Sequence, residues 1–275
     1  STMAVTPSKL AGIEDVLGSQ GRGPATALRA ILSRDTNWTM EHLDDVDTKL
    51  AGAVSVCKLG EAAERVRQAL GDKMLSTEGQ RQAAVKAFSP ALERLEGWLY
   101  RVAGELVEEL REAEGLIVAA LMPEKIPGQD AAVAELRAQE IRSHFFGMNE
   151  SQQAGALAAY GKRVALEQLA AVTSDPAGRF AIDKRALDVT RCEVIQRQHG
   201  DFVLVNLEDA RDRCDAAKWR MTSLFKVFAG WAADQYLPLE PSTRPWENLI
   251  EKELDRSQAF LNIFPADSTV AVVEE

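Results

Sequence analysis

Hydrophobic side chains recur at steps of three and four residues along nearly the whole chain, whereas alternation with period two is nearly absent. Steps of three and four bring side chains onto one face of an α-helix, and alternation is typical of a half-buried strand. The pattern therefore predicts an all-α fold, with one or more bundles built from about eight to ten helices, several of them long and amphipathic.

The longest stripe follows Pro90, which is predicted to start a helix because proline suits the first helical turn. Its apolar positions are Leu92, Leu95, Leu99, Val102, Leu106, Leu110, Ile117 and Leu121. Between Glu93 and Glu114 the chain carries seven Glu against three Arg, so we expect the far side of this helix to be acidic and solvated.

Polar residues at helix starts mark further boundaries. Thr77 with Gln80, and Asn149 with Gln152, have the spacing of capping boxes, which satisfy backbone N–H groups at a helix start. The helix that begins at Asn149 is predicted to continue to Val172. Other helices are predicted from about Asp130, from about Asp183 to Gly200, and from about Phe202 to Tyr236.

Two proline-containing interruptions divide the chain. MPEKIPGQD, residues 122–130, predicts a boundary between two halves. LPLEPSTRP, residues 237–245, holds three prolines, which favour an extended strap. The predicted domains are an N-terminal helical bundle over 1–121, a second helical unit over 130–236, and the Pro-rich strap, C-terminal helix and tail over 237–275.

The strap would project an apolar C-terminal helix that one small bundle does not fully bury. Its side chains are predicted to contact a partner: Trp246, Leu249, Ile250, Leu254, Phe260 and Phe264. The alternative is that this helix docks on its own domain, as terminal helices often do.

Composition limits the classes of partner. The 275 residues include 42 acidic and 32 basic ones, a formal net charge of −10, which opposes binding to the phosphate backbone of nucleic acids. A transmembrane helix needs about 20 predominantly apolar residues, and the chain has no such run and no signal-peptide pattern. We expect a soluble protein of the bacterial cytoplasm or of a virion, without a structural disulfide among its three cysteines.

The glycine-rich stretch GSQGRGPAT, residues 18–26, lacks the lysine of a phosphate-binding loop and follows a predicted helix instead of a strand. Gly18 fits the end of that helix and Pro24 the start of the next. This stretch is predicted to be a joint between helices.

No motif predicts a catalytic residue, a cofactor or a metal site. HExxH, GxSxG and Glu-x-x-His are absent, and the three histidines are scattered. Two acidic clusters leave one alternative open, a Mg²⁺-dependent helical enzyme similar to the isoprenoid synthases. The clusters are Asp44, Asp45 and Asp47, spaced DDxD where that family has DDxxD, and Glu208, Asp209 and Asp212.

Residues 134–180 resemble a pattern in helical proteins encoded by bacteriophages and prophages. The matching residues are Glu140, Ile141, Arg142, Met148, Ala158, Ala159, Gly161, Ala171, Val172 and Pro176. This resemblance implies a phage setting and a role in a virion or its assembly.

The expected function is therefore that of a non-enzymatic structural or assembly subunit, whose partners are other protein subunits or further copies of itself. A third hypothesis is an acidic regulatory binder of a host protein, in which the long acidic helix imitates nucleic acid.

Overall fold

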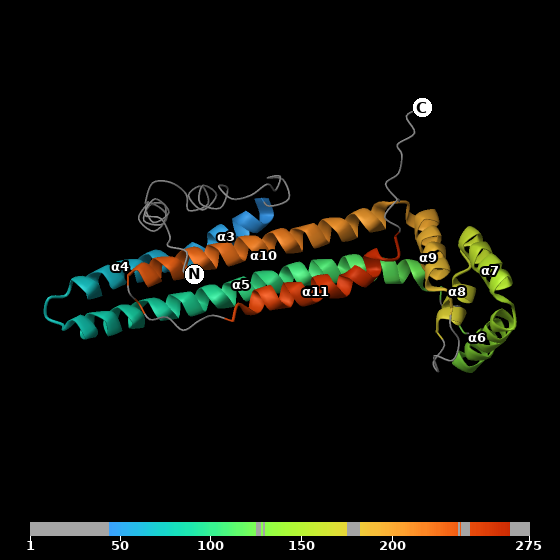
Figure 1. Ribbon diagram of the computed structural model, residues 1–275, viewed down its shortest axis with the longest axis horizontal. Helices are drawn as coiled ribbons and strands as arrows, with labels where there is room; N and C mark the ends of the chain where they lie inside the picture. Colours follow the sequence, from blue (N-terminus) through green and yellow to red (C-terminus); the bar gives the residue numbers. More distant parts are fainter. Residues whose placement is uncertain are drawn as a thin grey trace, which may run out of the picture. The chain divides into compact units, whose positions relative to one another are not determined.

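The computed structural model describes residues 44–124, 128, 130–174, 182–235, 237 and 243–264, except the side chains at 44, 45, 47, 51, 54 and 55 (Figure 1). The helices are α3 (Asp44–Val56), α4 (Leu59–Gly71), α5 (Thr77–Leu121), α6 (Ala131–Phe146), α7 (Glu150–Arg163), α8 (Leu166–Thr173), α9 (Lys184–His199), α10 (Phe202–Asp234) and α11 (Pro245–Leu261). Since these residues contain helices and no strand, the predicted all-α class is confirmed. The helices predicted around GSQGRGPAT and most of the Pro-rich strap lie outside the described residues.

The chain divides into two compact units. Unit 1 comprises the described residues of Ser1–Glu108 and Arg211–Leu254, and unit 2 those of Glu109–Ala210 and Asp255–Glu275. These divisions fall within α5, α10 and α11, so they do not coincide with the predicted boundaries at 121, 130 and 237.

Unit 1 is held together by apolar stripes on α5, α10 and α11. The Phe88 and Trp231 ring centroids lie 5.0 Å apart, and those of Phe225 and Trp246 lie 5.1 Å apart. The Cys214 thiol donates to the Leu106 carbonyl oxygen at 3.5 Å, so α10 also contacts the backbone of α5. In unit 1 the buried positions of α10 recur at steps of three and four: Cys214, Ala217, Met221, Leu224, Phe228 and Trp231.

A short turn joins α4 to α5 in unit 1 (Figure 1). The Ser76 hydroxyl accepts a hydrogen bond from the Gly79 N–H at 3.1 Å and thereby caps α5. The capping box predicted for Thr77 and Gln80 is therefore wrong by one residue: Thr77 is already helical, and the Gln80 amide donates to the Asp72 carbonyl oxygen at 2.7 Å.

Pro90 lies inside α5, so the prediction that it starts a helix is also wrong. A proline in a helix interior removes one hydrogen bond and costs about 3 kcal/mol. Its neighbours Phe88 and Ala91 are fully buried, and a buried phenylalanine alone contributes about 1.5–3 kcal/mol. Side-chain burial on both sides of Pro90 thus offsets the local cost.

Unit 2 contains a small core made by α6, α7, α8 and α9. Its buried members are Phe145, Leu157, Leu169, Val172 and Val194. In this core α6 contacts α8, and α7 contacts both α8 and α9. The predicted capping box of Asn149 and Gln152 is confirmed, with both hydrogen bonds present.

The predicted single helix from Asn149 to Val172 is wrong because the chain turns at Val164. This residue has φ 52° and ψ 47°, a left-handed conformation that ends α7, and α8 begins at Leu166. The turn brings Leu169 and Val172 onto the core that contains Phe145. Tertiary burial therefore overrides the local helical pattern.

Two polar contacts fasten other helices to the end of α5 in unit 2. The Gln198 amide of α9 donates to the Ala120 carbonyl oxygen at 3.1 Å. The Arg256 guanidinium of α11 lies 2.5 Å from the Glu114 carboxylate, whose side chain is only 7% exposed. Glu114 therefore belongs to the interior of unit 2, in contrast to its predicted place on the solvated face of α5.

We predict that Lys58→Gly stabilises unit 1 by about 0.5–1 kcal/mol, because Lys58 has φ 55° and a left-handed residue other than glycine is strained by about 1–2 kcal/mol. The Lys58–Glu61 ion pair at 3.9 Å is well exposed and contributes little. Urea unfolding measures the effect. The control is Lys252→Gly in the interior of α11, which should destabilise by about 1 kcal/mol; stabilisation by both variants would contradict this explanation.

We also predict that Arg256→Met destabilises unit 2 by about 1–3 kcal/mol, since the buried Glu114 carboxylate then loses a charged donor. Arg65→Met is the matched control, because the Arg65–Glu61 pair is exposed at 4.0 Å and its loss should change the unfolding free energy by less than about 0.5 kcal/mol. Equal effects of the two variants in thermal and urea unfolding would show that the Arg256–Glu114 contact contributes no more to the free energy of unfolding than an exposed ion pair does.

Candidate functional site

The six predicted partner-contact residues differ in exposure. Trp246 and Ile250 are fully buried in unit 1, where Trp246 packs against Phe225, and Phe264 is 9% exposed in unit 2. The other three are partly exposed: Leu249, Leu254 and Phe260. In this conformation the two deepest side chains pack against their own chain, as the alternative hypothesis of a helix docked on its own domain expects. A partner contact through the remaining residues stays a prediction.

The acidic cluster on α10 points to solvent. Glu208, Asp209 and Asp212 are all exposed, because the buried stripe of α10 runs through Leu207 and Ala210 on another face. The side chains of the other proposed cluster, at Asp44, Asp45 and Asp47, lie outside the described residues. The α10 carboxylates therefore have the placement of a solvated acidic face.

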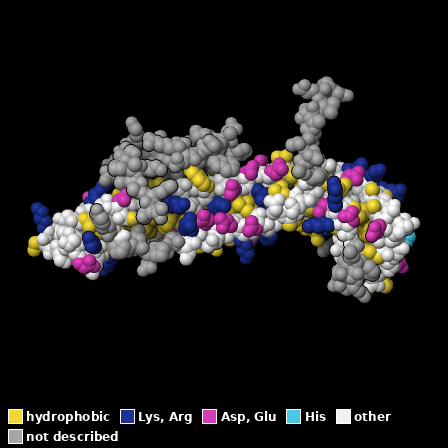
Figure 2. Space-filling view, viewed as in Figure 1, with side chains coloured by type: hydrophobic (Ala, Val, Ile, Leu, Met, Phe, Trp, Pro, Cys, Tyr) yellow, Lys and Arg dark blue, Asp and Glu magenta, His cyan; other side chains and the backbone are white. Residues whose placement is uncertain are grey.

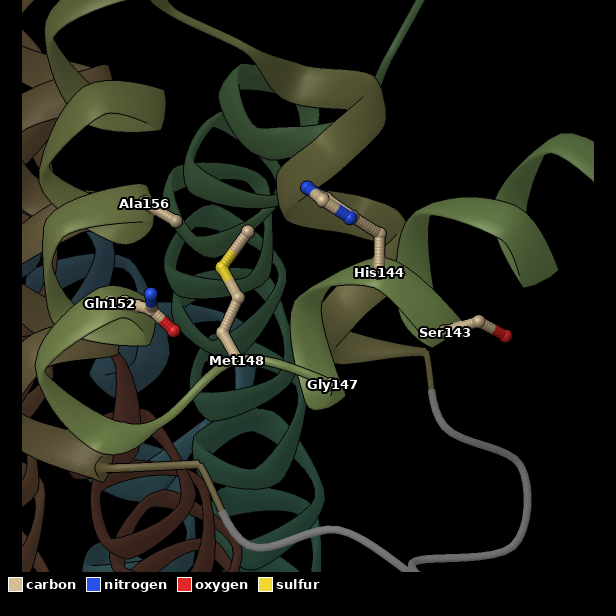
Figure 3. Close-up of a pocket in the computed structure, with 6 residues that line it drawn as sticks. All are labelled: Ser143, His144, Gly147, Met148, Gln152 and Ala156. Carbon is tan, nitrogen blue, oxygen red and sulfur yellow. The ribbon is translucent and has the colours of Figure 1, made fainter.

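A groove of about 620 Å³ opens between the end of α6 and the first turns of α7 in unit 2 (Figure 3). Its lining residues are Ser143, His144, Gly147, Met148, Gln152 and Ala156. The buried Phe145 anchors the end of α6, and the Asn149–Gln152 capping box fixes the start of α7. A Cβ at Gly147 would lie 3.2 Å from the Ser143 carbonyl oxygen, so a glycine suits this tight turn.

The groove has few groups that could do chemistry. Met148 stands between His144 and Ala156, while Ser143 points away from the imidazole (Figure 3). A serine nucleophile needs a base within hydrogen-bond reach, which this arrangement does not provide. The Gln152 side-chain oxygen accepts from the Asn149 N–H at 3.1 Å and is thus engaged in the cap. Met148 and Ala156 give this mixed groove an apolar part with an adaptable thioether, which suits contact with an apolar side chain.

The histidines do not converge. His144 and His199 are exposed on α6 and α9, and His42 lies outside the described residues. In the part of the chain that the structure describes, no three His, Cys, Asp or Glu side chains are grouped so that they could hold a metal ion. None of the described helices combines the length and the hydrophobicity needed to cross a membrane.

Cys57, Cys192 and Cys214 are buried, and none of the three is in a disulfide within the described residues. Burial raises the pKa of the Cys57 thiol above its ordinary value of 9.0, against a smaller lowering effect of the Arg94 guanidinium. Burial also raises the pKa of Cys192, and the carboxylates of Asp201 and Glu193 raise it further. A reactive cysteine has a lowered pKa and some exposure, so these two residues behave as structural thiols.

No family model, curated protein or solved structure matches this chain. The similarity of residues 134–180 to helical phage proteins therefore remains a prediction from the sequence. The α6–α7 groove was not among the predicted sites, although the Gly147-Met148 break between two helical patterns marks the turn that forms it.

We predict that raising the pH above about 9 lowers the unfolding free energy, because the Cys57 and Cys192 thiols ionise in the unfolded chain while the folded chain keeps them protonated. Their stabilising effect is thus complete below pH 9 and is lost as the pH rises toward their folded-state pKa. Urea unfolding at pH 8 and pH 10 measures it. The Cys57→Ala/Cys192→Ala variant should lose less stability over this range, and an identical loss would contradict the assignment.

Proposed function

We propose that this protein is a non-enzymatic structural or assembly subunit that binds other protein subunits, in a bacteriophage particle or its assembly apparatus. The phage setting rests on the resemblance of residues 134–180 alone. The role as a binding subunit rests on the surface of unit 2, which exposes hydrophobic side chains in pairs at helical spacing.

The pairs on unit 2 carry the proposal. On α6, Val133 and Leu136 are 49% and 60% exposed, and on α10, Phe202 and Val205 are 65% and 50% exposed. Each pair is separated by three residues, so its members lie on one side of their helix. Single exposed hydrophobic residues need no explanation, but neighbouring ones are typical of interaction surfaces.

The first two turns of α6 add to this argument. All residues from Ala131 to Arg137 are exposed, and the helix first becomes fully buried at Phe145. Helices gain most of their stability from packing of an apolar face, and short isolated helices are marginal in water. A helix start that is exposed on every side and carries Val133 and Leu136 is suited to packing against another subunit.

The alternative of a Mg²⁺-dependent enzyme gains less support. Its α10 carboxylates Glu208, Asp209 and Asp212 face solvent instead of lining a cleft. The third hypothesis is an acidic regulatory binder. Like the main proposal it is a protein-binding function, but its partner is a host protein. We therefore retain the assembly subunit as the function that the exposed hydrophobic pairs support best.

The test is the mass of complexes formed by the full chain when it is produced together with the proteins encoded beside it. We expect a complex of fixed stoichiometry in mass photometry and sedimentation velocity. Val133→Ser/Leu136→Ser should weaken it about tenfold or more, because paired apolar anchors carry much of the energy of an interface. Ala131→Ser/Ala134→Ser changes two exposed residues of the same turns and is the matched control.

A chain that stays monomeric with every tested neighbour would overturn the proposal. A complex that both double variants form with unchanged affinity would remove α6 from the interface. Circular dichroism of each variant ensures that a lost complex does not reflect a lost helix.

A further inference from the structure

The first turns of α5 carry a groove that no part of the proposed function uses. It has a volume of about 520 Å³, and Arg81, Val85, Lys86 and Pro90 are among its lining residues. Together with Glu78, Gln82 and Ser89, these positions lie along one side of the helix in unit 1. Its floor is largely apolar, and Arg81 and Lys86 are exposed at its rim.

This part of the chain is cationic although the whole protein is acidic. Residues 73–90 contain Lys73, Arg81 and Lys86 against a single carboxylate, Glu78, whereas the chain as a whole has a net charge of −10. The three cations make no ion pair within the described part of the chain. Next to them, at the turn between α4 and α5, Met74 is 92% exposed.

The start of α10 exposes acidic and hydrophobic side chains, and its charge is opposite to that of the cationic stretch on α5. Phe202 and Val205 are exposed, and the same side of the helix carries Asp201, Glu208 and Asp209, which are also exposed. Residues 201–210 contain no Lys or Arg. Figure 2 shows acidic and hydrophobic side chains side by side over this part of α10. We call these five residues the α10 face.

The two surfaces match in spacing as well as in charge. Phe202, Val205 and Asp209 are separated by three and four residues, and so are Gln82, Val85 and Ser89 in the groove. Rows of equal spacing allow the ridge of one helix to pack into the groove of another. In an antiparallel arrangement the Glu208 and Asp209 carboxylates would meet Arg81, while Phe202 would lie toward Pro90.

We propose that the α5 groove of one copy of this chain binds the α10 face of a second copy, with Phe202 as the apolar anchor. The inference rests on the proposed function and names one of the partners, a second copy of the same chain. The contact joins two different surfaces. A pair of copies joined by one such contact keeps one groove and one face free, so the chain can extend into a ring or an open filament, whereas a pair that makes the contact twice is a closed twofold dimer.

Charge reversal on the full chain tests the contact. The groove variant is Arg81→Glu/Lys86→Glu, and the face variant is Glu208→Lys/Asp209→Lys; all four residues are exposed. Each variant alone should lose self-association by about tenfold or more, since like charges then oppose each other across the contact. Lys184→Glu/Lys252→Glu makes the same charge change as the groove variant elsewhere on the surface and should associate as the wild type does.

Mixing and combining the variants distinguishes the contact from a general charge effect. An equal mixture should recover association, because the intact face of the groove variant meets the intact groove of the face variant, and the reversed groove meets a reversed face of opposite charge. The quadruple variant, with both surfaces reversed, should recover self-association. Sedimentation velocity over a range of concentrations measures each case, and dependence on concentration separates contact between copies from contact within one copy.

A wild-type chain that stays monomeric at every concentration overturns the inference, and so does a quadruple variant that stays monomeric while folded. If such a chain still forms a complex with a neighbouring protein, the inference fails and the proposed function stands. If it forms neither, both fail.

Discussion

The burial of one apolar stripe along α5 is the interaction on which the structure depends. In unit 1 the stripe includes Phe88, Leu95 and Leu99, and in unit 2 it continues through Leu110 and Ile117; all five are fully buried. Each such side chain contributes about 1.5–3 kcal/mol when it is removed from water. This burial allows α5 to contain residues that would destabilise an isolated helix. Pro90 is the clearest of them.

The burial of this stripe also explains why glycines are tolerated on the opposite side of α5. A Cβ at Gly97 or Gly104 would meet nothing within 4 Å, so neither glycine is needed for a close approach inside the chain. Glycine in a helix interior costs about 1 kcal/mol relative to alanine. The buried stripe outweighs this cost, which leaves the solvent-facing side of the helix free to vary in sequence without loss of the fold.

Much of the fold could be predicted because its signals are local. The stripe of α5 and the Asn149–Gln152 capping box depend on residues within a few positions of one another, and both are present. The turn at Val164 could not be predicted, since its neighbours keep a helical pattern and the turn is favoured by burial of Leu169 and Val172 in a core with Phe145. Ser76 and Thr77 are both good caps, and only the observed hydrogen bond to Gly79 distinguishes them.

The candidate site residues also include some whose placement could be predicted from the sequence and some whose placement could not. The outward direction of Glu208 and Asp209 follows once Leu207 and Ala210 are known to be buried, because positions one residue away from a buried stripe face elsewhere. The burial of Trp246 could not be predicted, since an apolar helix can cover its own domain or a partner with the same side chains. Trp246 contacts Phe225 of another helix, and the local sequence around Trp246 does not encode such a tertiary contact.

Net charge is a poor guide to local recognition in this protein because short stretches of the sequence differ in sign. The value of −10 describes the long-range field, which keeps copies apart and is screened over about 10 Å in 0.1 M salt. A contact between surfaces is decided at shorter range, where the stretch with Arg81 and Lys86 is cationic and the stretch with Glu208 and Asp209 is anionic. In the proposed contact between copies, pairing of these two stretches would offset the long-range repulsion between two acidic chains. A net charge that opposes nucleic-acid binding is thus compatible with a protein contact that depends on local charge.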